Sequence, residues 1–397
     1  MPFKVPEFPG AEDVIVGWDV GSVGADPELF VLDDKEHVLA PTQEHIQKIN
    51  ELETADKLGI DSPRRGAKTN TMLAPDGAQL ELHPAGTHCR GWLVDDLRHA
   101  LKGATQLLPI MGGSRLAIVP AVQVTLSTRK RFPPSANIFG CDPDWDAYSL
   151  AQSTKPMNAM THAWRYGAGH IHLGMSRVHL EASADVLQWV PAFICVQDMY
   201  TGLLGVSLDL ASELAKRRRK HVGKAGCFRV QPHGIEYRTP DNSWLRHPKL
   251  VYLIIDYARS AAGLFKLRTK EMAALASSNA KQAVQIINEN DVPAARKMLE
   301  ANVEFARSLR KEEKDKYCFD DLYMQIGGGS DMAHKVPNLL QAYDEQIRPG
   351  IEGASPAKEW ALDKVYKQAQ LYSDGCHGKF CGGGFDAVMA PQRRAVV

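Results

Sequence analysis

The spacing of apolar and polar positions predicts single strands separated by helices and long loops. Strand-like alternation or short apolar runs occur at 12–40, 74–84, 115–126, 170–174 and 234–240. Helical spacing occurs from about residue 42 and over about 87–108, 180–200, 247–267, 277–310 and 356–372. Because strands and helices do not alternate strictly, this order predicts an α+β fold rather than a parallel sheet.

Helical patterns dominate the chain after residue 246. We therefore expect two parts: residues 1–246 as the main core, and residues 247–397 as a mainly helical region packed on or completing that core. The amphipathic pattern within 277–310 is most simply explained by core packing, and helix-on-helix assembly is the alternative.

Four predicted strands carry a pair of polar residues on one face, because residues i and i+2 of a strand point the same way. The pairs are Asp26 with Glu28, Glu81 with His83, His170 with His172, and Glu236 with Arg238. One such strand is usually explained by a polar face turned to water. Four together, rich in carboxylates and imidazoles, indicate a site.

The residue types in these pairs indicate metal and phosphate chemistry. Carboxylates and imidazoles bind divalent cations, and oxygen-rich sets favour magnesium or manganese. Arg238 offers the planar fork that matches a phosphate group. The sequence has no GxxxxGK[ST] motif, so a nucleotide would bind at a metal-rich sheet rather than at a helix N-terminus.

A basic run, KRRRKHVGKAGCFR at 216–229, directly precedes the strand with Glu236 and Arg238. Such a run is commonly a solvated helix end. Here its VGKAG segment predicts a glycine-permitted turn that could bring backbone amides and Lys224 to an anion. Nucleic acid is the competing ligand, and the lack of interleaved aromatic residues makes it the weaker one.

Overall composition narrows the function classes. The 397 residues include 47 basic and 47 acidic side chains, which argues against a protein devoted to non-specific polyanion binding. We expect a cytoplasmic protein, because no apolar stretch reaches membrane-spanning length and the N-terminal residues do not resemble a secretory signal. Seven scattered cysteines predict reduced thiols, and Cys376, His377 and Cys381 lack the second half-site of a zinc centre.

Six segments in this order resemble the phage COOH-NH2 ligase type 2 family, a branch of amidoligases with the fold of glutamine synthetase and glutamate-cysteine ligase. The segments are GADPELFV (24–31), DGAQLELHP (76–84), GCDPDWDAY (140–148), GAGHIHLG (167–174), the run from Arg217 to Arg229, and GIEYRTPDNSWL (234–245). The resemblance covers roughly the first 250 residues. It implies a curved, mainly antiparallel sheet with helices on its outer face in a catalytic core over 1–246.

The last two strand segments also resemble glutamine synthetase itself, and this likeness implies roles for individual residues. By it, His170 resembles a metal ligand, Glu236 a carboxylate near the metal, and Arg238 a group that contacts the transferred phosphoryl. Glu28 and Glu81 resemble the strand glutamates that hold metals. The chain departs from glutamine synthetase where His83 stands beside Glu81 in place of an E-x-E pair, so His83 joins the expected ligand set.

The family implies joining of a carboxylate to an amine through an acyl phosphate, with ATP and Mg²⁺ or Mn²⁺ as cofactors. The expected phosphate-binding residues are Arg217, Arg219, Lys224, Arg229 and Arg238. Asp26, His172 and His83 are candidates for the base that accepts the amine proton. The expected partners are a small-molecule or side-chain carboxylate and an amine, with nucleic acid only as a modified-nucleotide substrate. Phage encoding would place the protein in the host cytoplasm, and a homo-oligomer is compatible with this fold.

Two other functions fit parts of the pattern. A zinc metallohydrolase would use His170, His172 and a carboxylate to activate water. A non-enzymatic phage binding protein would keep the fold without turnover.

Overall fold

The computed structural model describes residues 22–54, 72–87, 90–139, 144–152, 158–174, 183–209 and 212–309, together with 343, 344 and 348. The strand predicted from residue 12, the helix predicted over 356–372 and the Cys376–Cys381 segment lie outside these residues. Among the described helices, none is long and apolar enough to cross a membrane.

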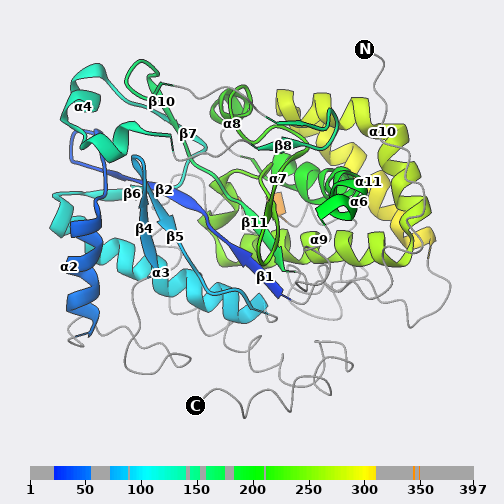
Figure 1. Cartoon of the computed structure of the whole chain (residues 1–397), viewed down its shortest axis with the longest axis horizontal. Coiled ribbons are helices and arrows are strands. Elements are labelled where there is room, and N and C mark those ends of the chain that lie inside the picture. Colours follow the sequence, from blue (N-terminus) through cyan, green and yellow to red (C-terminus); the bar gives the residue numbers. More distant parts are fainter. Residues whose placement is uncertain are drawn as a thin grey trace, which may run out of the picture.

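A six-stranded antiparallel sheet occupies the middle of the molecule (Figure 1). Its strands, in spatial order, are β1 (Ser22–Ala25), β11 (Ile171–Gly174), β13 (Gly234–Tyr237), β12 (Cys227–Gln231), β8 (Trp145–Asp146) and β9 (Ala151–Gln152). The register places His172 of β11 between Gly24 of β1 and Glu236 of β13. Strand β12 was not predicted, because its residues end a basic run that suggested only a turn.

A second sheet lies beside the first, at the left of Figure 1. It contains β3 (Val38–Leu39), β2 (Glu28–Leu32), β5 (Gln79–Leu82) and β4 (Leu73–Asp76), with β6 (Arg115–Ala117) also paired to β2. The predicted turn is present between β4 and β5, where Gly77 has a φ of 58°. A separate pair is formed by β7 (Ala121–Gln123) and β10 (Trp164–Tyr166).

Two predicted strands are each divided in the structure. The segment around Asp26 and Glu28 is not one strand: β1 ends at Ala25, β2 begins at Glu28, and the two belong to different sheets. Pro27 at the junction has no N–H to donate to a ladder. The strand predicted over 115–126 is likewise divided near Pro120 into β6 and β7, which pair with different partners.

The helices surround these sheets (Figure 1). They are α2 (Gln43–Thr54), α3 (Arg90–Met111), α4 (Leu126–Arg131), α6 (Ser183–Gln197), α7 (Leu203–Ser207), α8 (Ser212–Arg219), α9 (Pro248–Leu267), α10 (Thr269–Glu289) and α11 (Val292–Ser308). Short 3₁₀ turns occupy Pro134–Asn137 and Asn242–Arg246, and a π-helix over Asp198–Gly202 joins α6 to α7.

The single helix predicted over 277–310 is wrong, because α10 and α11 are separate. Asn290 ends α10 in the left-handed conformation, with a φ of 55°. Its side chain is held on both sides: its amide donates to Asp209 Oδ2 at 2.7 Å, and its oxygen accepts from Arg219. Tertiary hydrogen bonds therefore stabilise a break that the amphipathic pattern does not reveal.

One continuous hydrophobic core joins the sheets to the helices. It contains Leu173 and Ile235 from the central sheet, Leu97 from α3, Phe193 from α6 and Ile254 from α9, all fully buried. Helices α9, α10 and α11 contribute to the same core as the strands. The structure is thus a curled antiparallel sheet with several helices, compatible with the α+β class, and the boundary at residue 246 stays a prediction.

A buried carboxylate in the π-helix connects this core to the end of β13. Asp198 Oδ1 accepts hydrogen bonds from Tyr237 Oη at 2.5 Å and from Thr239 Oγ1 at 3.2 Å. Asp198 Oδ2 accepts from Tyr148 Oη at 3.0 Å. Burial raises the pKa of Asp198 to about 7, although these donors act in the opposite direction. The buried Asp198 carboxylate thereby fixes the positions of Tyr237 and Thr239, the two residues on either side of Arg238.

We predict that Gly202→Ala destabilises the protein by roughly 1–3 kcal/mol, the usual cost of overpacking. A β-carbon at Gly202 would lie 2.6 Å from Tyr237 Oη and 3.1 Å from Asp198 Oδ1. The matched control is Gly205→Ala in α7, where no atom lies within 4 Å of the new β-carbon and the helix gains about 1 kcal/mol of propensity. Thermal unfolding measures both, and equal melting temperatures would contradict the prediction.

Candidate active site

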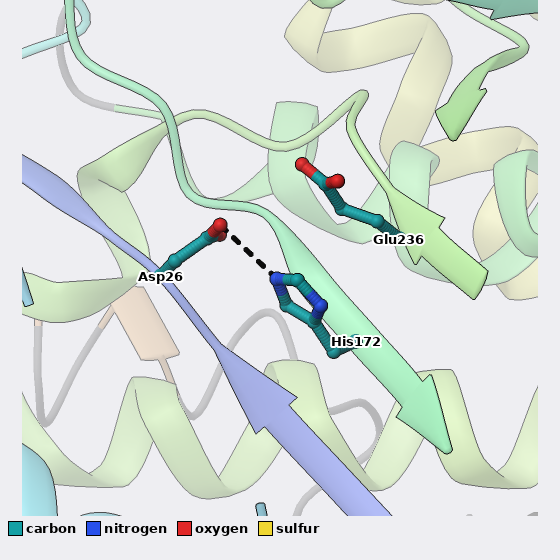
Figure 2. A group of neighbouring side chains, drawn as sticks. All are labelled: Asp26, His172 and Glu236. Carbon is teal, nitrogen blue, oxygen red and sulfur yellow. Dashed lines mark ion pairs between the residues drawn. The ribbon is translucent and has the colours of Figure 1, made fainter. Parts of the chain in front are cut away.

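Three side chains meet at the β11–β13 pair of the six-stranded sheet: His172 of β11, Glu236 of β13, and Asp26 from the segment just after β1 (Figure 2). One potential ligand atom from each lies within 4.8 Å of the others. His172 Nε2 lies 3.1 Å from Asp26 Oδ2, and on the other side of the ring His172 Nδ1 lies 2.9 Å from His233 Nε2. The strand register explains this meeting, since His172 and Glu236 are directly opposite each other in the ladder.

His170 occupies the position just before β11 and reaches the same cluster. Its Nδ1 lies 3.2 Å from Asp26 Oδ1 and 3.1 Å from Glu236 Oε1. Burial and the charge of Arg238 lower the pKa of His170, but Asp26 and Glu236 outweigh them and raise it to about 9. The ring is therefore charged at neutral pH in the absence of a metal.

The glycine before His170 allows the close packing that fixes its position. A β-carbon at Gly169 would lie 2.1 Å from the Asp241 carbonyl oxygen and 2.4 Å from Trp244 Nε1. Trp244 Nε1 donates to the Gly169 carbonyl at 3.1 Å. The GAGH sequence thus brings the loop against the 3₁₀ turn that follows β13.

Glu236 is the most heavily paired carboxylate of the cluster. Arg238 Nη1 contacts its Oε1, Gln231 Nε2 donates to its Oε2 at 2.7 Å, and Arg229 Nη1 lies 3.6 Å from Oε2. Burial raises the pKa of Glu236, but His170 and Arg238 outweigh burial and hold it well below its usual range. Glu236 is therefore ionised at any pH at which the protein would be assayed.

Arg238 is held in place by a second carboxylate, Asp144. Arg238 Nε lies 2.7 Å from Asp144 Oδ1, and Arg229 Nη2 lies 3.5 Å from the same oxygen. All of these groups are largely buried, so the ion pairs are shielded from water and their geometry is restricted.

Glu28 and Glu81 form a second group of carboxylates where β2 pairs with β5. The two residues are directly opposite in register. Burial, followed by the charge of Asp76, raises the pKa of Glu28 to about 8, and burial also raises the pKa of Glu81. His83 contacts Glu81, which raises the pKa of the imidazole. Excess negative charge at this position would be relieved by a bound cation.

A pocket opens beside Glu28 and His170. Its lining includes the carboxylates of Glu28 and Asp76 together with Arg218, Gly223 and Arg238. Ile138, Phe139 and Tyr166 supply apolar and aromatic surface, and His170 reaches the pocket from the cluster. The pocket is open, and its empty space counted together with the solvent at its mouth is about 470 Å³. An anionic ligand with an apolar part and a bound cation would fit this distribution of groups.

The basic run is divided by the structure. The predicted turn is present, with φ of 63° at Gly223 and 80° at Gly226. Arg219 donates to Asn290 Oδ1 and lies 3.6 Å from Asp241, and its role in phosphate binding stays a prediction. Arg217 is exposed and lies over the Trp164 ring, 4.2 Å from its centroid.

Lys224 is also exposed, and neither it nor Arg217 lines the pocket. Their role in phosphate binding stays a prediction, as does that of Arg229.

Sequence reasoning missed several residues that the fold adds to the site. Asp144 lies in the GCDPDWDAY segment, whose resemblance could have indicated it. Arg218 is one of three consecutive arginines, and only the direction of its side chain in the fold distinguishes it from Arg217 and Arg219. Asp76 and Gln79 belong to the β4–β5 hairpin, and Gln79 Nε2 lies 3.4 Å from Glu28 Oε2. The predicted pairs do converge, although their division into metal ligands and bases stays untested.

The donor set fits a divalent cation. Asp26, His172 and Glu236 offer two carboxylates and one imidazole nitrogen, a mixture suited to magnesium or manganese. Asp26 and His172, predicted as candidate bases, thus lie with Glu236 in the one group that the described residues assemble at ligand distance. Glu28, Glu81, His83 and His170 keep their predicted metal roles as hypotheses.

Comparison with known proteins supports the resemblance seen in the sequence. Residues 158–315 match the family model described as phage phiEco32-like COOH.NH2 ligase-type 2. The match includes His170, His172, Glu236 and Arg238, and it leaves out Asp26, Glu28 and Glu81, which precede it. Neither the curated proteins nor the solved structures contain a match to this chain. The family resemblance is thus confirmed over that stretch, and it supports a carboxylate–amine ligase activity.

We predict that Asp26→Asn weakens Mn²⁺ binding at least about tenfold, since loss of even an outer-shell partner typically costs that much. The substitution keeps the shape of the side chain and removes its charge. Asp34→Asn is the control, because Asp34 is an exposed carboxylate nearby in the sequence and outside the cluster. Titration by electron paramagnetic resonance or calorimetry measures the affinity. Unchanged binding in Asp26→Asn would exclude Asp26 as a ligand.

We also predict a pH-dependent contribution of His170 to stability in metal-free buffer. The folded-state pKa of about 9 exceeds the usual 6.5, so the contribution is complete below pH 6.5 and is lost as pH rises through 9. The difference in melting temperature between the wild type and His170→Gln should therefore shrink between pH 6.5 and pH 9.5. A difference that is constant over this range would contradict the charged ring.

Proposed function

We propose that this protein is an ATP-dependent carboxylate–amine ligase that forms an amide bond through an acyl phosphate. The observation that carries the proposal is a candidate cation site, formed by Asp26, His172 and Glu236, next to a pocket with two buried guanidinium groups. His170 and Arg238 contact Glu236 and also line that pocket. The ligase family match over 158–315 supports it. A curled antiparallel sheet with helices around it is also what a glutamine synthetase-like fold requires, and we propose that fold here.

In this proposal, Asp26, His172 and Glu236 hold Mg²⁺ or Mn²⁺. The cation, when bound, supplies positive charge that neutralises polyphosphate oxygens. Glu28 and Glu81 would provide a second position for a cation, since the raised pKa values of both groups reflect carboxylates buried without enough positive charge nearby.

Arg238 would stabilise the phosphoryl group during transfer. Its guanidinium is oriented by Asp144 and Glu236, so little reorganisation is needed when charge develops on the transferring oxygens. A carboxylate oxygen of the substrate attacks the γ-phosphorus of ATP, and ADP leaves. The amine then attacks the acyl carbon, phosphate leaves, and the amine proton passes to a base.

The geometry favours His83 among the three candidate bases. Asp26 and His172 lie in the cation-binding cluster, where bound metal would occupy the lone pairs that a base needs. His83 lies outside that cluster, with 53% of its side chain exposed, and it contacts Glu81. Glu81 would hold the ring in orientation while it accepts a proton.

The zinc hydrolase is less favoured by these contacts. That hydrolase would hold one ion with His170, His172 and a carboxylate, whereas the group at mutual ligand distance combines His172 with the two carboxylates of Asp26 and Glu236. Arg218 and Arg238 beside the cluster also match a phosphate-containing ligand better than a site that only activates water. Stoichiometric zinc in the purified protein, without ATP binding, would support the hydrolase.

We predict that purified protein releases ADP only when a carboxylate and an amine are both present with Mg²⁺. Arg238→Ala and Glu236→Gln should each lower kcat by roughly 10²–10³-fold, the scale seen when a preorganised electrostatic contact is removed. Lys130→Ala is the control, since Lys130 is an exposed cation on α4. Mass spectrometry of the products identifies the amide. Full activity in both site variants would exclude this assignment.

A further inference from the structure

Arg218 is a buried cation that makes no ion pair with any carboxylate of the described residues. It lies in α8 with 1% of its surface exposed, and it lines the pocket beside Gly223 and Arg238. Its Nη1 donates to the Thr239 carbonyl at 3.0 Å, and its Nη2 lies 3.3 Å from the Arg238 carbonyl. Nε is buried and has no hydrogen-bond partner. A guanidinium with unused donors in a pocket is suited to bind an anion.

Neighbouring arginines are compensated in a way that Arg218 is not. Arg219 has Asp241 within ion-pair distance, and Arg238 has Asp144 and Glu236. Within the described part of the chain, no carboxylate comes within ion-pair distance of Arg218. Burial lowers the pKa of Arg218 to about 10, and the charges of Asp241 and Glu28 oppose burial only in part. An anionic ligand would offset the rest of the cost of burying this charge.

The turn after α8 is built around this guanidinium. Gly223 has a φ of 63°, and a β-carbon there would lie 2.1 Å from Arg218 Nη1. Glycine is therefore required both by the backbone conformation and by the position of the arginine. This close approach fixes the guanidinium at the wall of the pocket.

We propose that Arg218 and Arg238 together form a phosphate-binding subsite of this pocket. The planar fork of each guanidinium matches phosphate oxygens. Glu28 and Asp76, which line the same pocket, would face the cation that accompanies the phosphate. The identification of ATP as a source of the phosphate rests on the proposed function, and inorganic phosphate is the other source with the same chemistry.

Calorimetry with two probes, ADP with Mg²⁺ and inorganic phosphate, tests the subsite without any carboxylate or amine. Arg218→Met should weaken ADP binding at least about tenfold, since hydrogen bonds to charged groups are worth more than neutral ones. Arg218→Lys should weaken it less, because lysine keeps the charge and loses the fork. Lys220→Ala, an exposed cation just after α8, should bind like the wild type.

The two probes separate the sources of the phosphate. A loss for ADP alone assigns Arg218 to the nucleotide, and a loss for both probes assigns it to phosphate groups in general. Circular dichroism and melting temperature establish that each variant is folded. If Arg218→Met does not fold, the binding affinities of Arg218→Lys test the proposal instead. Wild-type affinity for both probes in a folded Arg218 variant would overturn the proposal.

Failure of the subsite is distinguishable from failure of the ligase. If Arg218 is needed for ADP binding but no carboxylate–amine pair yields ADP release, the ligase assignment is wrong and the subsite stands. If ADP release occurs and the Arg218 variants bind both probes normally, the subsite is wrong and the ligase stands.

Discussion

The site depends on the two-residue alternation of strand β13 and the segment that follows it. Glu236 and Arg238 face the cation cluster and the pocket, whereas Tyr237 and Thr239 face the interior and donate to Asp198. A shift of one residue in register would exchange these sets, placing two charged groups in an apolar core. The buried Asp198 network therefore fixes the direction of the groups that the proposed chemistry uses.

Charge compensation explains the rest of the site. Glu236 and Asp144 are matched by Arg238, Arg229 and His170, and the contacts orient each group. Compensation is incomplete at two positions, the Glu28–Glu81 pair and Arg218, and both border the same region. The carboxylates are negative and Arg218 is positive, so a ligand that combines a cation with a phosphate group would neutralise both. In the free protein, the desolvation cost of these buried charges remains uncompensated at the place where the ligand is proposed to bind.

The sequence predicted more of the site than of the strand boundaries. The pairs His170 with His172 and Glu236 with Arg238 could be identified because period-two alternation is a local property of a strand. Asp26 and Glu28 were selected as site residues but assigned to one strand, because nothing local shows that the chain changes sheets at Pro27. Arg218 could not be separated from Arg217 and Arg219, since three adjacent helical positions differ only in which neighbours pack around them.

The sequence by itself determined the residue types of the site, the glycines of the 223–226 turn, the α+β order of elements and the ligase resemblance. These features follow from periodicity, backbone conformation and composition, all of which depend on residues that are close together in the sequence. Only the tertiary structure decided that Asp26, His172 and Glu236 come within ligand distance of one another, that Asp144 contacts Arg238, and that the buried Arg218 Nε has no hydrogen-bond partner among the described residues. Those outcomes depend on strand register and on distances between residues far apart in the chain, and no local pattern determines such distances.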